Sequence, residues 1–169
     1  MNKLIVLTIL IFSGLFNTFA VAEVNLSGIK NYRQLNDNFS SAGLPDAEEI
    51  ALLKNAGYQH IINLIPGDYS NEKSQVESAG MTFNQIPVVW KKPTLENFQK
   101  FAQLMKKYQG DKVLVHCQLN YRASAFAYLY QVTQLKIDKQ EAFKMMATVW
   151  EPEGDWAEFI ETVEAHYQD

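Results

Sequence analysis

Hydrophobic and polar positions recur with two different periods along this chain, and the change of period marks helices and strands. Apolar residues at helical spacing run from Ala47 to Leu53, and the pattern stops at Gly57. The apolar stretch 60–65 is typical of a short strand, and it ends at Pro66-Gly67, the residue order of a type II turn. This part of the fold is therefore predicted to be a helix followed by a strand.

The same alternation continues through the middle of the chain. A second helix is predicted over residues 71–79, closing at Gly80, and a second strand over 81–89. Apolar positions at helical spacing then define one face of a helix over residues 95–108. The predicted order is thus helix, strand, helix, strand, helix.

The stretch 112–116 (KVLVH) is almost continuously apolar, which is typical of a central parallel strand covered on both faces. Three helical stretches follow: one from about Arg122, one that begins with the capping box Asp138-x-x-Glu141, and one whose apolar stripe ends at Tyr167. Strands alternating with helices predict an α/β fold. We expect three layers, α/β/α, with a mostly parallel central sheet of about four to five strands and ligands at the C-terminal ends of the strands.

The N-terminal segment has the pattern of a secretory signal. A short basic start at Met1-Asn2-Lys3 precedes the apolar run 4–16, and Ala20-Val21-Ala22 supplies the small residues of a cleavage site. We therefore expect a signal peptide over residues 1–22, a single mature domain over 23–169, and a periplasmic or secreted protein. An uncleaved N-terminal anchor is the alternative, although the apolar run is short for a membrane span, and no stable span is expected after cleavage.

Composition narrows the classes of partner. The chain has 169 residues, 47% of them hydrophobic, and a formal net charge of -4, which fits one globular domain with an adequate core. Its basic residues form no run longer than the pairs Lys91-Lys92 and Lys106-Lys107. This distribution argues against a nucleic acid partner.

The chain contains one cysteine, Cys117. An exported protein lies in a compartment that favours disulfides, so an unpaired thiol there is either buried or used. Residues 116–124 (HCQLNYRAS) lead from the end of the buried strand into a helix, where backbone N–H groups and the helix dipole converge on an anion. That position and the cation of Arg122 favour a nucleophilic thiolate. The guanidinium of Arg122 is also suited to hold two oxygens of a phosphate-like or sulfate-like anion.

Several neighbours are expected to complete this site. Asn120 is the non-glycine residue best able to take a positive φ in a loop that has no glycine. Ser124 is expected to donate a hydrogen bond to the thiolate, and His116 to orient the loop by bonding to backbone. The predicted anion-binding set comprises Gln118, Leu119, Asn120, Tyr121, Ala123, Ser124, Trp90 and Lys91. For Trp90 and Lys91 a solvated loop, and for Tyr121 simple packing, are the alternative interpretations.

The sequence VLVHC, with Arg122 and Ser124 after it, resembles the signature of the protein-tyrosine and dual-specificity phosphatase superfamily. Ile86-Pro87-Val88 and Ala42-Gly43-Leu44-Pro45 resemble its bacterial branch related to the phosphatase-like domain of beta-lactamase-hydrolase-like proteins. The resemblance covers most of residues 39–165. It implies a cysteine-phosphatase-like fold and a phosphorylated substrate, with no metal and no other cofactor.

The resemblance also implies a mechanism. Cys117 attacks phosphorus to give a phosphocysteine, which water then hydrolyses. Arg122 and the N–H groups of residues 118–122 stabilise the equatorial oxygens.

Two features depart from the superfamily. Four residues separate Cys117 from Arg122, where five are usual, and the sulfurtransferase rhodanese shares the shorter spacing. The aspartate general acid expected beyond Ile86-Pro87-Val88 is replaced by the sequence 89–92 (VWKK). A rhodanese-like sulfurtransferase and an anion-binding module without turnover therefore stay open as alternative functions.

Three other carboxylates are candidates for the missing acid: Asp68, Glu151 and Asp155. Asp68 is favoured because the loop after strand 60–65 lies at the same sheet edge as Cys117 if the two strands are parallel, although a solvated turn is the simpler interpretation. Asp111 is excluded, since it precedes strand 112–116 at the opposite edge.

Overall fold

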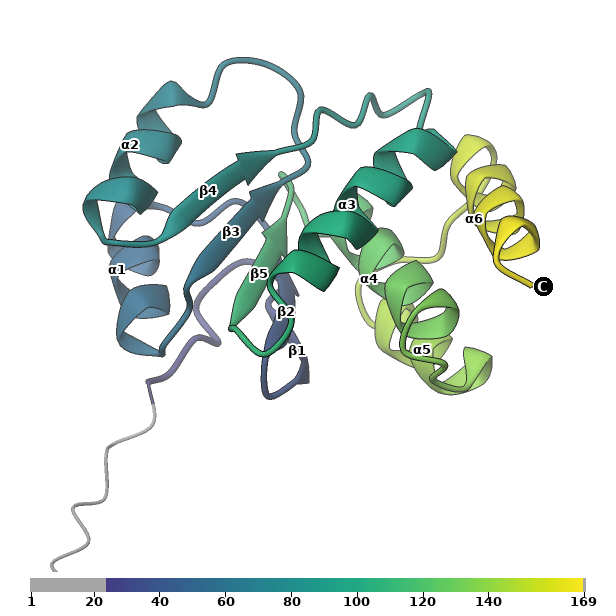
Figure 1. Ribbon diagram of the computed structural model, residues 1–169, viewed down its shortest axis with the longest axis horizontal. Helices are drawn as coiled ribbons and strands as arrows, with labels where there is room; N and C mark the ends of the chain where they lie inside the picture. The colour runs from purple at the N-terminus through teal and green to yellow at the C-terminus, as the bar shows by residue number, and fades with distance from the viewer. Residues whose placement is uncertain (1–23, 169) are drawn as a thin grey trace, which may run out of the picture.

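The computed structural model describes residues 24–168 (Figure 1). The signal segment predicted over residues 1–22 lies outside the described residues. The described part of the chain forms a five-stranded sheet and six helices.

The sheet is mostly parallel, as predicted. Its strand order is β1-β2-β5-β3-β4, and only the β1–β2 pair at one edge is antiparallel. The strands span Arg33–Asn36 (β1), Phe39–Ala42 (β2), His60–Asn63 (β3), Thr82–Gln85 (β4) and Val113–His116 (β5). The last of these is the central strand, and its C-terminal end leads directly into Cys117.

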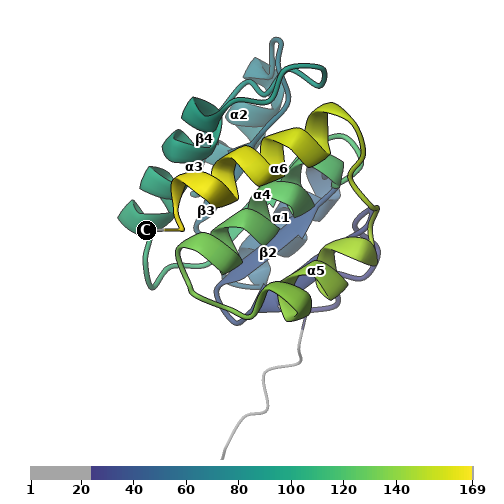
Figure 2. The same cartoon turned by 90° about the vertical axis from the view of Figure 1, so that its right-hand side faces the viewer.

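Helices cover both faces of the sheet, which confirms the three-layer prediction (Figure 1). One face carries α1 (Ala47–Asn55) and α2 (Ser70–Ser78), and the other carries the remaining four helices. Figure 2 shows α4 running between α5 and α6. These four helices span Leu95–Lys107 (α3), Tyr121–Thr133 (α4), Lys139–Ala147 (α5) and Asp155–His166 (α6).

Side chains of the central strands alternate between two cores. Ile61 and Leu114 are fully buried in the core beneath α1 and α2, while Ile62, Val113 and Val115 belong to the larger core beneath α3, α4 and α6. A strand sends successive side chains to opposite faces, so both faces must be apolar where helices cover both. The continuous apolar run of residues 112–116 follows from this.

The hairpin of β1 and β2 was not predicted, and its composition explains why. All four residues of β2 (FSSA) are buried, yet two of them are serines whose hydroxyls are hydrogen-bonded. Ser40 Oγ accepts from Tyr58 Oη at 2.6 Å, and Ser41 Oγ accepts from Asn120 Nδ2 at 3.1 Å. Buried hydroxyls that find such partners are tolerated in a core, but they remove the hydrophobic signal of a strand.

The strand predicted over 81–89 is longer than β4. Beyond Gln85 the chain still bonds to its neighbour, since Ile86 N donates to Asn63 O at 2.9 Å and Val88 N to Leu64 O at 3.2 Å.

Among the described residues, no helix combines the length and the apolar character needed to cross a membrane.

Candidate active site

Cys117 lies at the C-terminal end of the central strand, where the chain turns into α4. Its N–H donates to Ala42 O of the neighbouring strand at 3.3 Å, and only 1% of the residue is exposed. It nevertheless lines a pocket of about 300 Å³ that it shares with five other residues: Trp90, Gln118, Leu119, Tyr121 and Arg122. All six were predicted from the sequence to belong to the site.

The loop is held in a left-handed turn at Asn120, as predicted. Asn120 has a φ of 69° and is fully buried. Its side-chain Nδ2 donates to Asn31 O at 2.7 Å and to Ser41 Oγ at 3.1 Å. Asn31 Nδ2 in turn donates to Leu119 O at 3.0 Å. Asn31, in the segment before β1, therefore fixes the conformation of the loop.

The backbone donors of the loop are left free. The first backbone hydrogen bond of α4 runs from Ser124 N to Asn120 O at 2.8 Å. Within residues 24–168, the N–H groups of 118, 119 and 121–123 have no protein acceptor, while Leu119 forms an isolated antiparallel bridge with Gly43. Unpaired N–H groups at a helix N-terminus carry positive potential and are a common site for anions.

Arg122 lies against the ring of Trp90. Its guanidinium carbon is 5.3 Å from the ring centroid, a cation–π distance. Its Nε is buried and makes no hydrogen bond to any residue that the structure describes. The indole thus holds the guanidinium without using its N–H donors, which stay available for an anion.

An aromatic wall, made of Trp90, Tyr121, Trp150 and Trp156, surrounds this contact. Tyr121 and Trp150 are stacked with centroids 5.1 Å apart, and Trp90 lies 5.5 Å from Trp150 and 5.2 Å from Trp156. Trp150 Nε1 donates to Tyr121 O at 2.9 Å, and Trp156 Nε1 to Trp90 O at 2.9 Å. Trp156 belongs to the predicted apolar stripe that ends at Tyr167, whereas Trp150 was missed because no pattern linked it to the loop.

The predicted contact of Ser124 with the thiolate is wrong. Ser124 Oγ donates to Tyr121 O at 3.1 Å and accepts from Trp150 Nε1 at 3.1 Å. A serine in the first turn of a helix readily bonds to a carbonyl three or four residues earlier. Ser124 therefore connects the aromatic wall to α4. Its neighbour Ala123 is fully buried.

The predicted backbone bond of His116 is also wrong. Its side chain is fully buried, and its Nε2 lies 2.7 Å from Glu72 Oε1, although the two groups are not aligned as a hydrogen bond. No sequence signal pointed to Glu72, because its helix brings it to the strand from 44 residues away.

Asp68 lies in the exposed turn before α2 and does not line the pocket. Its carboxylate accepts from Ser70 N at 2.9 Å, and this backbone hydrogen bond, aided by the Ser70 side chain, lowers the pKa of Asp68. A lowered pKa favours the ionised form, which is the opposite of what a general acid needs at neutral pH.

Lys91, Glu151 and Asp155 are likewise exposed and outside the pocket lining. Asp111 lies at the opposite sheet edge, as expected, where its Oδ2 is 2.9 Å from His60 Nε2.

Tyr69, at the N-cap of α2, is a neighbour that sequence reasoning missed. Burial raises the pKa of Tyr69, the Glu72 carboxylate adds to this, Arg122 opposes it, and Cys117 raises it further. The phenol of Tyr69 therefore lies within electrostatic reach of Glu72, Arg122 and Cys117.

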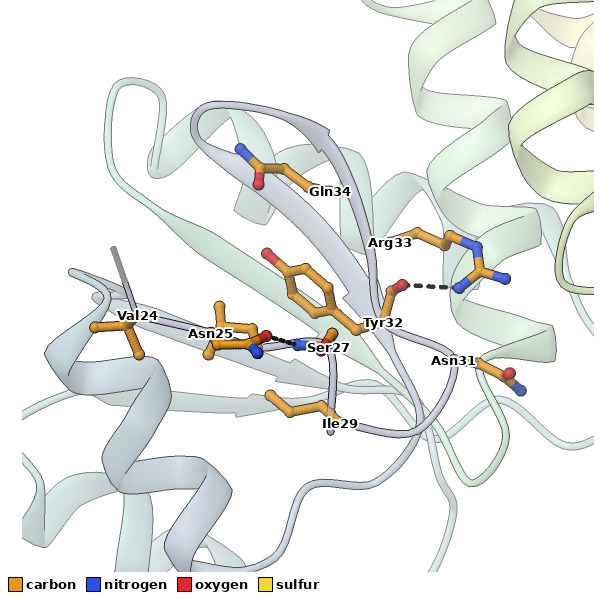
Figure 3. A pocket seen from close by; sticks show the side chains of 9 residues that line it. Val24, Asn25, Ser27, Ile29, Asn31, Tyr32, Arg33 and Gln34 are labelled. Carbon is orange, nitrogen blue, oxygen red and sulfur yellow. Dashed lines mark hydrogen bonds between the residues drawn. The ribbon is translucent and has the colours of Figure 1, made fainter. Parts of the chain in front are cut away.

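Two larger hollows lie elsewhere on the part of the chain that the structure describes. A hollow of about 610 Å³ is lined by the segment from Val24 to Gln34, where Tyr32 lies over the stretch held by the bond from Ser27 N to Asn25 Oδ1 (Figure 3). A second of about 610 Å³ lies between α3 and the end of α4. Within residues 24–168, no cluster of three His, Cys, Asp or Glu side chains is placed to hold a metal ion.

Comparison with solved structures places this architecture among phosphatases. A DUF442 protein of the phosphatase type from Shewanella putrefaciens CN-32 is 37% identical, with a TM-score of 0.76 over 84% of this chain and 96% of that one. TpbA from P. aeruginosa is 18% identical with a TM-score of 0.67 over 83% and 92% of the two chains, and it has been solved with pTyr. PTPMT1 is 19% identical with a TM-score of 0.68 over 81% and 96%, and it has been solved with PI(5)P. The last two likenesses show the fold alone.

Comparison with curated sequences agrees with this placement. A beta-lactamase hydrolase-like protein of Xylella fastidiosa (strain Temecula1 / ATCC 700964) is 31% identical over 117 residues, which is 64% of this chain. The matched part covers 27% of that protein, so the chain spans about a quarter of the length of this relative. No family model matches the chain.

Proposed function

The chain belongs to the DUF442 branch of the protein-tyrosine and dual-specificity phosphatase superfamily, and from this membership we propose that it is a cysteine-dependent phosphatase acting on phosphomonoesters. The observation that carries the proposal is the pocket of about 300 Å³ that Cys117 and Arg122 line together. In the same loop, the N–H groups of residues 118, 119, 121 and 122 have no protein acceptor among the described residues. A thiol, a guanidinium and unpaired amides around one small pocket are the groups that phosphoryl transfer to cysteine requires.

The proposed reaction has two steps. In the first, the Cys117 thiolate attacks phosphorus, the S–P bond forms, and the ester oxygen leaves with the bonding electrons. In the second, water attacks the phosphocysteine, the S–P bond breaks, and inorganic phosphate is released as the thiolate is restored. In both steps, Arg122 and the N–H groups of residues 118–122 stabilise the charge on the equatorial oxygens. No metal and no other cofactor takes part in this scheme.

Relatives support a phosphorylated substrate. TpbA binds pTyr and PTPMT1 binds PI(5)P in their crystal structures, so phosphate esters on an aromatic or a cyclic alcohol both fit this fold. The aromatic wall beside Arg122 favours an apolar or aromatic group next to the phosphate in this chain.

Sulfur transfer is a second candidate function, because the loop Cys117-x4-Arg122 has the length found in rhodanese. In that reaction the Cys117 thiolate would attack the outer sulfur of thiosulfate, the S–S bond would break with release of sulfite, and a cysteine persulfide would form. A module that binds anions without turnover is the third candidate, since no carboxyl group lines the described pocket.

One set of assays separates the three functions. The purified mature protein is incubated with an aryl phosphate and, separately, with thiosulfate and cyanide, in parallel with the variant Cys117→Ser. We expect phosphate release that the variant lacks. Release that persists in Cys117→Ser would contradict the cysteine mechanism, and activity on thiosulfate alone would make sulfur transfer the function. If the protein binds phosphate but is inactive in both assays, its function is that of an anion-binding module.

We also propose that the protein is exported and works in the periplasm or outside the cell. The basic start, apolar run and small-residue site of residues 1–22 support this proposal. Mass spectrometry of the protein recovered from the periplasm is expected to show a chain that begins at Glu23. Recovery of the full chain from the cytoplasm would contradict it.

A further inference from the structure

The segment that leads into β1 contacts the surroundings of the pocket at two points, and Asn31 is the first. The tripeptide Asn-Tyr-Arg occurs twice in the chain, at 31–33 and at 120–122. In both copies the asparagine has a positive φ, 50° at Asn31 and 69° at Asn120. Hydrogen bonds join the two copies, since Asn120 Nδ2 donates to Asn31 O at 2.7 Å. The backbone that carries Arg33 is therefore already tied to the anion loop.

The guanidinium of Arg33 forms the second contact, at the C-terminal end of α5. Its Nε donates to Thr148 Oγ1 at 2.7 Å, its Nη2 to Thr148 O at 2.8 Å, and its Nη1 to Tyr32 O at 2.8 Å, the last bond being dashed in Figure 3. Thr148 is the C-cap of α5, where carbonyls lack helical partners and the helix dipole favours a cation. The planar guanidinium thus fixes the end of α5 to β1 across 115 residues of sequence.

The end of α5 in turn places Trp150. The backbone N–H of Trp150 donates to Met146 O at 3.1 Å, in the last turn of the helix. The indole of Trp150 is stacked on Tyr121 at a centroid distance of 5.1 Å and an interplanar angle of 15°, and it lies 5.5 Å from the ring of Trp90. Tyr121 and Trp90 both line the pocket. Stacked rings of this kind keep their geometry only if each ring is anchored.

We propose that Arg33 is a positioning residue for the aromatic wall and that it sets the preference of the pocket for an aromatic group beside the phosphate. With Arg33 in place, the end of α5 keeps Trp150 against the two rings that line the pocket. Asn31 holds the anion loop by separate bonds, so the loss of Arg33 should leave the grip on the phosphate group intact. The inference rests on the proposed function, because it assumes that the pocket binds a phosphate ester.

The first test uses the fluorescence of the wall itself. All three tryptophans of the chain belong to the aromatic wall: Trp90, Trp150 and Trp156. In Arg33→Gln, we expect the tryptophan emission maximum to move to longer wavelength and acrylamide to quench the emission more strongly, because the rings become more exposed to water. The matched control is Lys54→Gln, which removes a cationic donor from Gly80 O, just beyond α2 on the other face of the sheet. Its emission should coincide with that of the unmodified protein.

The second test measures the selectivity of the pocket with phenylphosphonate and methylphosphonate, two analogues without a hydrolysable ester bond. Calorimetry gives the dissociation constant of each. In Arg33→Gln, we expect the dissociation constant of phenylphosphonate to rise several-fold and that of methylphosphonate to change little, so that the preference for the aromatic ligand falls. General loosening of the fold would instead weaken the binding of both ligands together. Lys54→Gln should keep both dissociation constants.

Thermal unfolding shows whether each variant is folded. A folded Arg33→Gln protein with unchanged emission, or with an unchanged ratio of the two dissociation constants, would overturn the inference. If Arg33→Gln does not fold, Arg33→Lys provides the decision, because an ammonium group keeps the charge but lacks the planar fork that serves both acceptors of Thr148. We expect smaller shifts in the same direction for Arg33→Lys, and unchanged readouts would again overturn the inference.

Neither readout needs turnover, so the inference and the proposed function fail separately. Shifts in both readouts without phosphate release would keep the role of Arg33 and reject the proposed reaction. Phosphate release by a folded Arg33→Gln protein with unchanged readouts would do the reverse. If neither phosphonate binds the unmodified protein, the role of Arg33 in selectivity is overturned, while the phosphatase assay still decides the reaction.

Discussion

Trp156 holds Trp90 in place over the pocket, since its indole Nε1 donates a 2.9 Å hydrogen bond to Trp90 O. The two rings are also in contact, with centroids 5.2 Å apart. Trp90 occupies the stretch in which the resemblance to dual-specificity phosphatases led us to expect an aspartate. The position next to the nucleophile is thus filled by a fixed indole in this chain.

Removing the indole N–H of Trp156 should weaken the aromatic wall. In Trp156→Phe the Trp90 carbonyl loses its partner, and we expect KM for an aryl phosphate to rise several-fold with a smaller change in kcat. The free energy of unfolding should fall by about 1–3 kcal/mol. Steady-state kinetics and urea unfolding measure the two effects. The control is Phe143→Leu, an exposed aromatic on α5 that lies outside the wall. An unchanged KM in folded Trp156→Phe would contradict the prediction.

A pocket without a carboxylic acid should be sensitive to the leaving group. Loss of a general acid costs about 10²- to 10⁴-fold in rate, and most where the leaving oxygen is basic. We expect kcat/KM to fall steeply along a series of aryl phosphates as the pKa of the phenol rises. Asp68→Asn is expected to follow the same line as the unmodified protein. A shallow dependence that becomes steep in Asp68→Asn would identify Asp68 as the acid after all.

Stability at acidic pH should depend on Asp111. The hydrogen bond from His60 holds the pKa of Asp111 below its usual value, and a weaker bond from Gln59 at 3.2 Å assists. A carboxyl whose pKa is lower in the folded state contributes stability above its unfolded pKa of about 3.9 and loses it as the pH falls through the folded pKa.

In Asp111→Asn this contribution is absent. We expect a smaller loss of unfolding free energy between pH 5 and pH 2 than in the unmodified protein, measured by urea unfolding at each pH. Asp37→Asn, a change at an exposed turn, is the control. Parallel curves for Asp111→Asn and the unmodified protein would contradict the prediction.

The left-handed turn at Asn120 gives a prediction about the loop itself. Asn120→Ala removes both side-chain hydrogen bonds and places an unfavourable residue at a φ of 69°, whereas Asn120→Gly removes the same bonds without the steric cost. Both variants should be less stable than the unmodified protein. The alanine variant should be less stable than the glycine variant by about 1 kcal/mol, measured by urea unfolding. Equal stabilities would show that the turn relaxes on substitution.

Much of the fold followed from periodicity because most of its elements carry a clear apolar face. The run at 112–116 identified the central strand, and the glycine at 57 marked the end of the first helix. The β2 strand was not predicted because Ser40 and Ser41 are buried and form hydrogen bonds that only the folded structure shows.

The site was predictable where its residues are contiguous and obscure where they are not. Cys117, Arg122 and the positive φ of Asn120 could be inferred from one loop. Glu72 lies on α2 and contacts His116, and Trp150 lies in the segment between α5 and α6 and contacts Tyr121. Neither carries a local signal, since a glutamate in a first helical turn is ordinarily solvated. The hydrogen-bond partner of Ser124 was predicted wrongly because a sequence does not show to which carbonyl its hydroxyl donates.

The two bonds that join Asn31 to the anion loop span 88 and 89 residues of sequence. Chain entropy opposes the closure of such long loops, and contacts of this kind form after the local helices. We therefore expect the loop around Cys117 to reach its final conformation late in folding, after the helices that flank it. The proposed phosphatase activity should accordingly appear only after the contacts of Asn31 with residues 119 and 120 have formed.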